Sequence, residues 1–233
     1  MGLISKEYRS KFACYSAIFD ILEANWVDFY NDKIPKNKRI RSLVEDGYIE
    51  PVLENNRFLI SEFMHSFFPK GVYLEIGVHT GCSLVSAAIG APEARCIGID
   101  HLKFWNKNGK SEERLNSYLN KYKKKFRLNN IEFIKKEGMV GIKELFRAEP
   151  DLKVDLFYYD AEHKYEPQIK TVEAMIPHMN ENCIICIDDI AVRGITNANV
   201  SFVKRNPGFS DSLNIVGRGW GLGFGIIVRG KIR

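Results

Sequence analysis

The stretch Gly71–Gly81 constrains the fold of this chain more than any other segment. An apolar run ends at Glu75, Gly77 and Gly81 follow, and a segment with helical spacing begins directly afterwards, at residues 83–88. This order predicts a strand, a tight glycine turn and a helix, because glycine adopts backbone conformations that other residues rarely reach. Unpaired N–H groups at the start of such a helix favour a bound carboxylate or phosphate.

The spacing of these glycines separates two kinds of ligand site. The order here is Glu-x-Gly-x-x-x-Gly, whereas dinucleotide-binding folds carry Gly-x-Gly-x-x-Gly. An NAD-dependent oxidoreductase is therefore disfavoured. A purely structural turn is the remaining alternative, so the rest of the chain must decide.

Beyond residue 71 apolar segments alternate with helical ones, which predicts a doubly wound α/β fold with a mostly parallel sheet covered on both faces. The expected strands are Val72–Ile76, Ala94–Ile99, Ile131–Ile134, Val154–Tyr159, Cys183–Ile187, Ser212–Val216 and Phe224–Val228, seven in all. The expected helices are Ser83–Ala88, Ser111–Phe126, Gly141–Arg147 and Glu166–His178. The last two strands flank a glycine-rich connection and predict a terminal antiparallel hairpin.

The N-terminal part of the chain has a different pattern. Aromatic and aliphatic residues recur at helical spacing over residues 6–30, and a second helix is expected at Ser61–Phe68. We interpret residues 1–68 as a helical extension that acts as a lid, a substrate wall or a contact in a homo-oligomer. Residues 69–233 then form the ligand-binding domain.

Composition and cysteine content indicate what class of protein this is and in which compartment it is expected. With 233 residues, 45% hydrophobic and 27% charged, the chain is expected to be a soluble globular protein with one main domain. Its N-terminus has no apolar signal region and no run is long enough for a bilayer. Five scattered cysteines predict reduced thiols and a cytoplasmic location. Cys183 and Cys186 lie in an apolar strand and are expected to be buried rather than a redox or zinc pair.

The net charge of +5 owes much to one basic run, Lys121–Arg127. We interpret it as the solvated end of a helix. A docking patch for nucleic acid is the alternative, but the run is short, so we expect a small-molecule substrate and neither a nucleic-acid nor a membrane partner.

Carboxylates follow several of the expected strands. Glu75, Asp100 and Asp160 each end a strand, and Asp188 and Asp189 end another. Asp100 lies at the distance from the glycine turn at which an acidic residue can bind a ribose. Asp160, Asp188 and Asp189 are expected to converge, and a divalent cation such as Mg²⁺ would relieve their repulsion. The alternative is that Asp188 and Asp189 cap the next helix while Asp160 bonds the loop Ala161–Lys164.

Histidines supply a candidate proton acceptor near the carboxylates at the strand ends. His163 lies three residues after Asp160 and can take a proton from a substrate hydroxyl, or else act as a cap. His79 lies in the glycine turn and His101 follows Asp100, so either can contact a ligand.

Together these residues resemble a class I S-adenosylmethionine (SAM)-dependent O-methyltransferase over about residues 70–228. The run Tyr159-Asp-Ala-Glu-His-Lys-Tyr-Glu166, followed by Asp188-Asp189, is similar to the signature of the methyltransferase-24 group, which includes macrolide-sugar O-methyltransferases. It is also similar to the magnesium site of catechol O-methyltransferases, although His163 stands where those enzymes have a lysine base.

The resemblance implies SAM as cofactor and a role for each matching residue. Glu75, Gly77 and Gly81 would line the methionine part of SAM, Asp100 would hold the ribose, and Glu137 would lie near the adenine. The cation, Mg²⁺ or another divalent ion, would bind Asp160, Asp188 and Asp189. His163 or Asp160 would be the base.

The predicted reaction is metal-assisted methyl transfer to a hydroxyl of a small molecule such as a sugar or a catechol-like diol. Two alternatives stay open: a metal-independent RNA or protein methyltransferase, and a module that binds an adenosyl ligand without catalysis.

Overall fold

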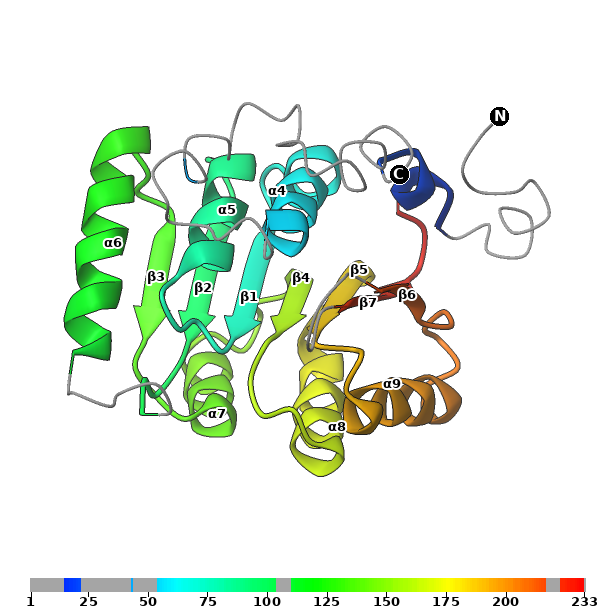
Figure 1. Cartoon of the computed structure of the whole chain (residues 1–233). Helices are drawn as coiled ribbons and strands as arrows, with labels where there is room; N and C mark the ends of the chain where they lie inside the picture. The colour runs from blue at the N-terminus through cyan, green and yellow to red at the C-terminus, as the bar shows by residue number, and fades with distance from the viewer. Residues whose placement is uncertain (1–14, 22–42, 44–53, 104–109, 217–222, 233) are drawn as a thin grey trace.

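A seven-stranded sheet in the order β3-β2-β1-β4-β5-β7-β6 forms the centre of the computed structural model (Figure 1). The structure describes residues 15–21, 43, 54–103, 110–216 and 223–232. Strands β1 to β5 pair in parallel, and β7 runs antiparallel to both β5 and β6. The predicted α/β class, the parallel sheet and the terminal antiparallel hairpin are therefore confirmed.

The strands are short and most of their residues are buried. Their bounds are Val72–Ile76 (β1), Arg95–Ile99 (β2), Ile131–Ile134 (β3), Val154–Tyr159 (β4), Met179–Asp188 (β5), Leu213–Val216 (β6) and Gly223–Arg229 (β7). Continuous apolar runs are expected for strands that are covered on both faces. The strand order reverses between β1 and β4, and ligands of open α/β sheets bind at such a point, beyond the carboxyl ends of the strands.

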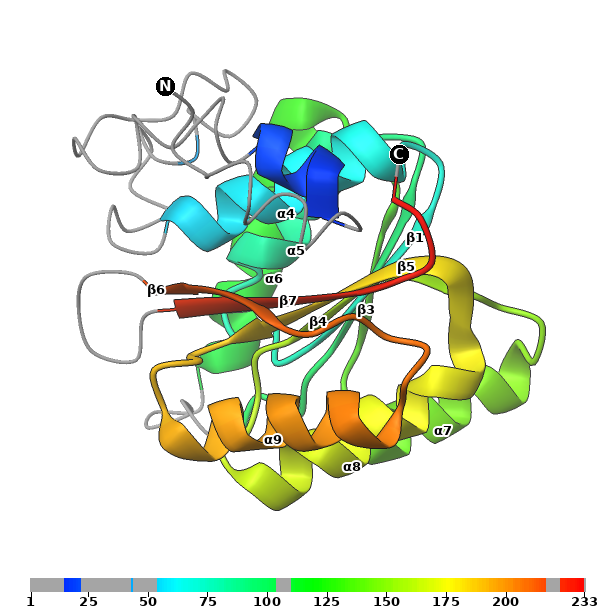
Figure 2. The ribbon, with the colours of Figure 1, turned by 90° about the vertical axis from the view of Figure 1, so that its right-hand side faces the viewer.

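Helices cover both faces of the sheet (Figure 2). On one face lie α4 (Glu54–Phe67), α5 (Cys82–Gly90) and α6 (Ser111–Phe126). On the other lie α7 (Gly138–Ala148), α8 (Tyr165–Met175) and α9 (Arg193–Arg205), with a short 3₁₀ helix, η3 (Ile176–His178), after α8. Each layer has its own apolar core. Cys186 belongs to the first core and Cys183 to the second, and both are buried, as predicted.

Helices α4 and α9 and strand β5 differ most from the sequence prediction. Helix α4 begins at Glu54, seven residues before the expected Ser61, because its first turn is polar and carries no apolar signal. Strand β5 begins at Met179, four residues before the expected Cys183. The residues just before Cys183 are polar and exposed, so they carry no apolar strand pattern. Helix α9 was not predicted from the sequence. Its buried residues have helical spacing, but one of them, Asn199, is polar and interrupts the apolar pattern.

Part of the N-terminal extension is described. Residues 15–21 are helical, and the Tyr15 hydroxyl donates to the Ile226 carbonyl of β7 at 2.9 Å and lies 2.6 Å from Ser210 Oγ. Most of residues 1–53 and the glycine-rich connection at 217–222 lie outside the described residues. Within the described part of the chain, no helix is both long and apolar enough to cross a bilayer.

Candidate active site

The glycine turn after β1 has the backbone that the sequence predicted. Gly77 has φ +96° and Gly81 has φ +83°, which is the left-handed region that favours glycine. A Cβ atom on Gly77 would lie 1.7 Å from the carbonyl oxygen of Asp160. Gly77 is therefore required by protein packing as well, since the loops after β1 and β4 touch at this point.

Asp100 holds the glycine turn in place. Its Oδ2 accepts the backbone N–H groups of Val78 and His79, both at 2.9 Å, and its Oδ1 accepts that of Leu102 at 2.6 Å. His101 Nδ1 accepts the N–H of Lys103 at 3.0 Å. Asp100 Oδ1 also lies 3.5 Å from His101 Nδ1. The predicted ribose contact of Asp100 remains a prediction.

Glu75 lies beside the turn and is fully buried on β1. The Tyr73 hydroxyl donates to its Oε2, whereas Oε1 has no hydrogen-bond partner among the described residues. Burial raises the pKa of Glu75 from its ordinary value of 4.5 to about 8. An unpaired buried carboxylate oxygen is costly unless a donor or cation reaches it, so this atom favours a ligand with a positive charge or an N–H group.

Glu137 lies at the start of α7. Its carboxylate accepts the N–H groups of Met139 and Val140 at 3.2 and 3.1 Å, so it is the N-cap of that helix. The family resemblance implied an adenine contact for Glu137, and the cap explains why α7 begins at Gly138 rather than at the expected Gly141. Its contact with adenine stays a prediction.

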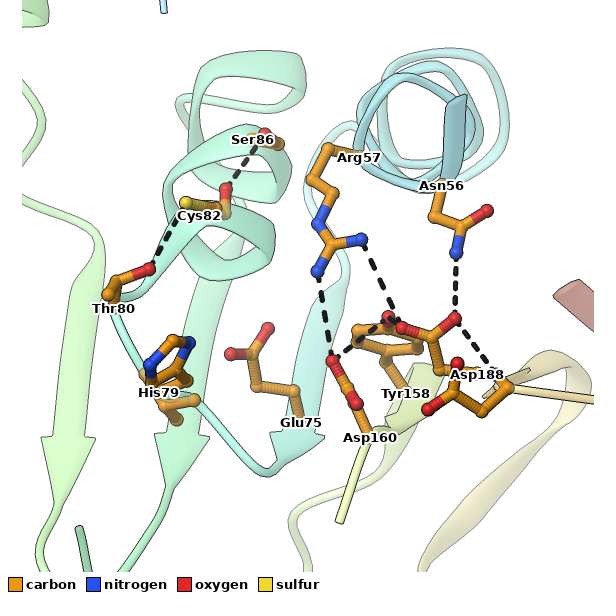
Figure 3. A network of polar contacts seen from close by, with 12 residues as sticks. Asn56, Arg57, Glu75, His79, Thr80, Cys82, Ser86, Tyr158, Asp160 and Asp188 are labelled. Atoms are coloured by element: carbon orange, nitrogen blue, oxygen red, sulfur yellow. Dashed lines mark hydrogen bonds and ion pairs between the residues drawn. The ribbon is translucent and has the colours of Figure 1, made fainter. Parts of the chain in front are cut away.

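Two of the predicted carboxylates, Asp160 and Asp188, lie close together at the carboxyl ends of β4 and β5 (Figure 3). The hydroxyl of Tyr158 donates to Asp188 Oδ2 at 2.7 Å and to Asp160 Oδ2 at 3.3 Å. From α4, Arg57 forms ion pairs with both carboxylates and Asn56 Nδ2 donates to Asp188 Oδ1 at 2.7 Å (Figure 3). The cluster therefore joins three elements that are distant in the sequence.

The charges in this cluster perturb one another. Burial and the charge of Asp188 raise the pKa of Asp160 well above its usual range, and Arg57 opposes that rise. Burial lowers the pKa of the Arg57 guanidinium, but Tyr158, Asp188 and Asp160 outweigh burial and raise it. Arg57 is therefore charged at every accessible pH.

The third predicted ligand, Asp189, pairs with His163. Asp189 Oδ2 lies 3.1 Å from His163 Nδ1, and the backbone of Asp189 is left-handed, with φ +55°. Burial, followed by the charge of Asp188, raises the pKa of Asp189 above its ordinary value. The described residues contain no group of three histidine, cysteine or acidic residues placed to hold a metal ion. Only part of the expected convergence is therefore seen.

Sequence reasoning missed Tyr158, Asn56 and Arg57. Tyr158 carried a signal, because it lies two residues before Asp160 and strand residues two apart share a face. Asn56 and Arg57 carried none. They belong to a polar first turn of a helix, and only the packing of α4 on α5 brings them over the sheet edge.

Comparison with known protein families identifies the family of this chain. The family model described as "Methyltransferase domain", that of the methyltransferase-24 group, matches residues 74–190, about half of the chain. The chain belongs to this methyltransferase-24 family. The predicted identity as a class I SAM-dependent methyltransferase is confirmed. The match includes Glu75, Asp160, His163 and both Asp188 and Asp189, whereas Arg57 lies outside it.

Solved structures share this fold at low identity. An O-methyltransferase from Bacillus cereus in complex with SAH is 16% identical with a TM-score of 0.63, covering 89% of this chain and 98% of its own. The O-methyltransferase TomG from Streptomyces achromogenes, in complex with SAM, is 13% identical with a TM-score of 0.61, covering 88% and 96%. CalS11, a TDP-rhamnose 3′-O-methyltransferase, is 16% identical with a TM-score of 0.58, covering 97% and 95%. A comparison with curated protein sequences gave no match.

Proposed function

We propose that this methyltransferase-24 chain transfers the methyl group of SAM to a hydroxyl of a small molecule, with His163 as the base. The observation that carries the proposal is the His163–Asp189 pair beyond the carboxyl ends of β4 and β5, next to the point between β1 and β4 where the strand order reverses. The O-methyltransferases that share the fold support a hydroxyl acceptor, and CalS11 supports a sugar among the acceptors to be tested.

The residues around the glycine turn suit SAM. The unpaired Oε1 of Glu75 would face the positively charged methionine part, and Gly77 and Gly81 leave the turn open to the ligand. Helix α5 has no side-chain cap, so its first N–H groups suit the cofactor's carboxylate. Asp100 would contact the ribose from its place beside the turn. When bound, SAM supplies a methyl group on a sulfonium, which is a good leaving group.

His163 is arranged to accept a proton. Asp189 at Nδ1 orients the imidazole and favours the tautomer with hydrogen on that nitrogen, which leaves Nε2 as the acceptor atom. The His163 side chain is 43% exposed, so an acceptor hydroxyl can reach it. Removal of the hydroxyl proton as the methyl group moves would make the oxygen a stronger nucleophile. Asp160, the alternative base, contacts Arg57 and Tyr158 instead.

An RNA acceptor has less support. Lys123 of the basic run donates to the Ile131 carbonyl at 3.1 Å, and Lys121 and Lys125 lie over neighbouring aromatic rings. Helix α6, which carries the run, lies on the β3 side of the sheet, away from the β4–β5 edge (Figure 1). Oligomerisation through the N-terminal helices, a lid role for residues 1–68 and the cytoplasmic location remain predictions.

The first experiment is a calorimetric titration of S-adenosylhomocysteine into the purified chain, with NAD as control. We expect micromolar affinity for the adenosyl ligand and none for NAD. Absence of binding would contradict the proposed cofactor site. A panel of sugar and catechol acceptors, assayed with isotopically labelled SAM, then identifies the acceptor class.

His163→Gln tests the base. Because a general base contributes about 10²–10⁴-fold to rate, we expect kcat to fall by that factor while affinity for S-adenosylhomocysteine is unchanged. His178→Gln is the matched control, because that ring stacks on Phe146 and precedes the first residue of β5, at the opposite end of the strands from His163, and should leave kcat unchanged. Full activity in the His163 variant would exclude it as the base.

A further inference from the structure

The site has its own source of positive charge in Arg57. Its Nη2 lies 3.8 Å from Asp160 Oδ2 and its Nη1 lies 4.0 Å from Asp188 Oδ2, and its side chain is only 11% exposed. Figure 3 shows the guanidinium pointing from α4 between these two carboxylates. Two carboxylates that share one hydroxyl group, that of Tyr158, repel each other unless a cation lies near both.

Both oxygens of Asp188 already accept hydrogen bonds. Its Oδ1 accepts from Asn56 Nδ2 at 2.7 Å and from the N–H of Asp189 at 3.0 Å, and its Oδ2 accepts from Tyr158 at 2.7 Å. Mg²⁺ requires oxygen ligands at about 2.1 Å in near-octahedral geometry. A metal ion that used both oxygens of Asp188 would displace Asn56 of α4 from a carboxylate that is almost fully buried.

The third carboxylate is also engaged. Asp189 points to His163 rather than to the pair formed by Asp160 and Asp188. The residues that the sequence assigned to a divalent cation are therefore divided between two other partners, Arg57 and His163. This arrangement does not fit a metal held by all three carboxylates.

We propose that Arg57 takes the place of the divalent cation, so that its guanidinium neutralises and positions Asp160 and Asp188 and the wild-type chain binds no divalent metal there. Arg57 is thus a positioning residue supplied by α4, outside the matched family region. Its consequence for methyl transfer depends on the proposed function, but its effect on metal binding does not. Methyl transfer should persist in EDTA.

The test is a titration of the full chain with Mn²⁺. The electron paramagnetic resonance signal of the free ion measures how much Mn²⁺ stays unbound. The wild-type chain should show no saturable binding up to about 1 mM Mn²⁺, which corresponds to a weak, non-specific association. Arg57→Gln should bind one Mn²⁺ at least about tenfold more tightly, because removing one partner leaves the carboxylates uncompensated. Arg57→Lys, which keeps the charge, should behave as the wild type does.

Two further variants locate the effect. Arg205→Gln removes an exposed arginine that pairs with Glu173 at 3.3 Å and should leave Mn²⁺ binding as in the wild type. Adding Asp160→Asn to Arg57→Gln should abolish the gained site. A merely structural role for Arg57 would not create a metal site that depends on Asp160.

Two results would overturn the proposal. One is stoichiometric Mn²⁺ binding by the wild-type chain that is lost in Asp160→Asn, and this measurement holds even if Arg57→Gln fails to fold. The other is a folded Arg57→Gln variant that gains no binding. The titration with S-adenosylhomocysteine is independent of both, so failure of the cofactor assignment and failure of the Arg57 assignment can be told apart.

Discussion

At the scale of single residues, Gly77 is the point at which the loop after β1 contacts the loop after β4. We expect Gly77→Ala to lower the free energy of unfolding by about 2–4 kcal/mol, because φ is +96° and the new Cβ would overlap the Asp160 carbonyl. Affinity for S-adenosylhomocysteine should fall with it. Urea unfolding and calorimetry measure both effects. Gly208→Ala is the control, since a Cβ there meets nothing within 4 Å. Equal stability of the two variants would contradict the contact.

Glu75 should make stability depend on pH. Burial raises its pKa from 4.5 to about 8, so between these values the folded chain holds a proton that the unfolded chain has released. Stability therefore falls as pH rises through this window, by up to about 1.4 kcal/mol per pH unit for one proton. Glu75→Gln should remove the part of that slope that Glu75 contributes, whereas Asp160 and Asp189, whose pKa values are also raised, keep theirs. The variant should be the more stable protein at pH 8.5, by on the order of 2–4 kcal/mol.

Urea unfolding at several pH values between 5 and 8.5 measures the Glu75 effect. Glu93→Gln, a change at an exposed glutamate paired with Lys70, should keep the wild-type slope. If the Glu75→Gln variant shows the same slope as the wild type, Glu75 is ionised in the folded chain at neutral pH and the explanation fails.

At the scale of elements, close packing of α4 on α5 positions Arg57 over the sheet edge. A Cβ on Gly90 of α5 would lie 2.2 Å from the Ser61 carbonyl of α4. We expect Gly90→Ala to destabilise the fold by about 1–3 kcal/mol, because the two helices must separate. Gly194→Ala in α9 is the control. Its nearest contact would be an ordinary 3.5 Å, so helix propensity should make it neutral or slightly stabilising in the same unfolding assay.

At the scale of the whole molecule, the site depends on segments that lie far apart in the sequence. Helix α4, the turn after β1 and the ends of β4 and β5 all contribute side chains to one edge of the sheet. The parallel order places the carboxyl ends of β1, β4 and β5 together, and the covering helix adds a cation above them. The family match begins after α4, so the family pattern alone does not reveal that contribution.

The sequence by itself determined the α/β fold, the glycine turn and the carboxylates at the strand ends. These features follow from local rules, since hydrophobic periodicity and glycine spacing act over a few residues. It did not determine that Glu137 caps a helix, that Asp189 turns to His163, or that Arg57 enters the carboxylate pair. Tertiary packing decided these contacts, because a carboxylate at the end of a strand can bind whichever donor or cation the folded chain brings near it. Carboxylates at neighbouring strand ends predict a metal site, but the same carboxylates can instead bind the guanidinium of an arginine.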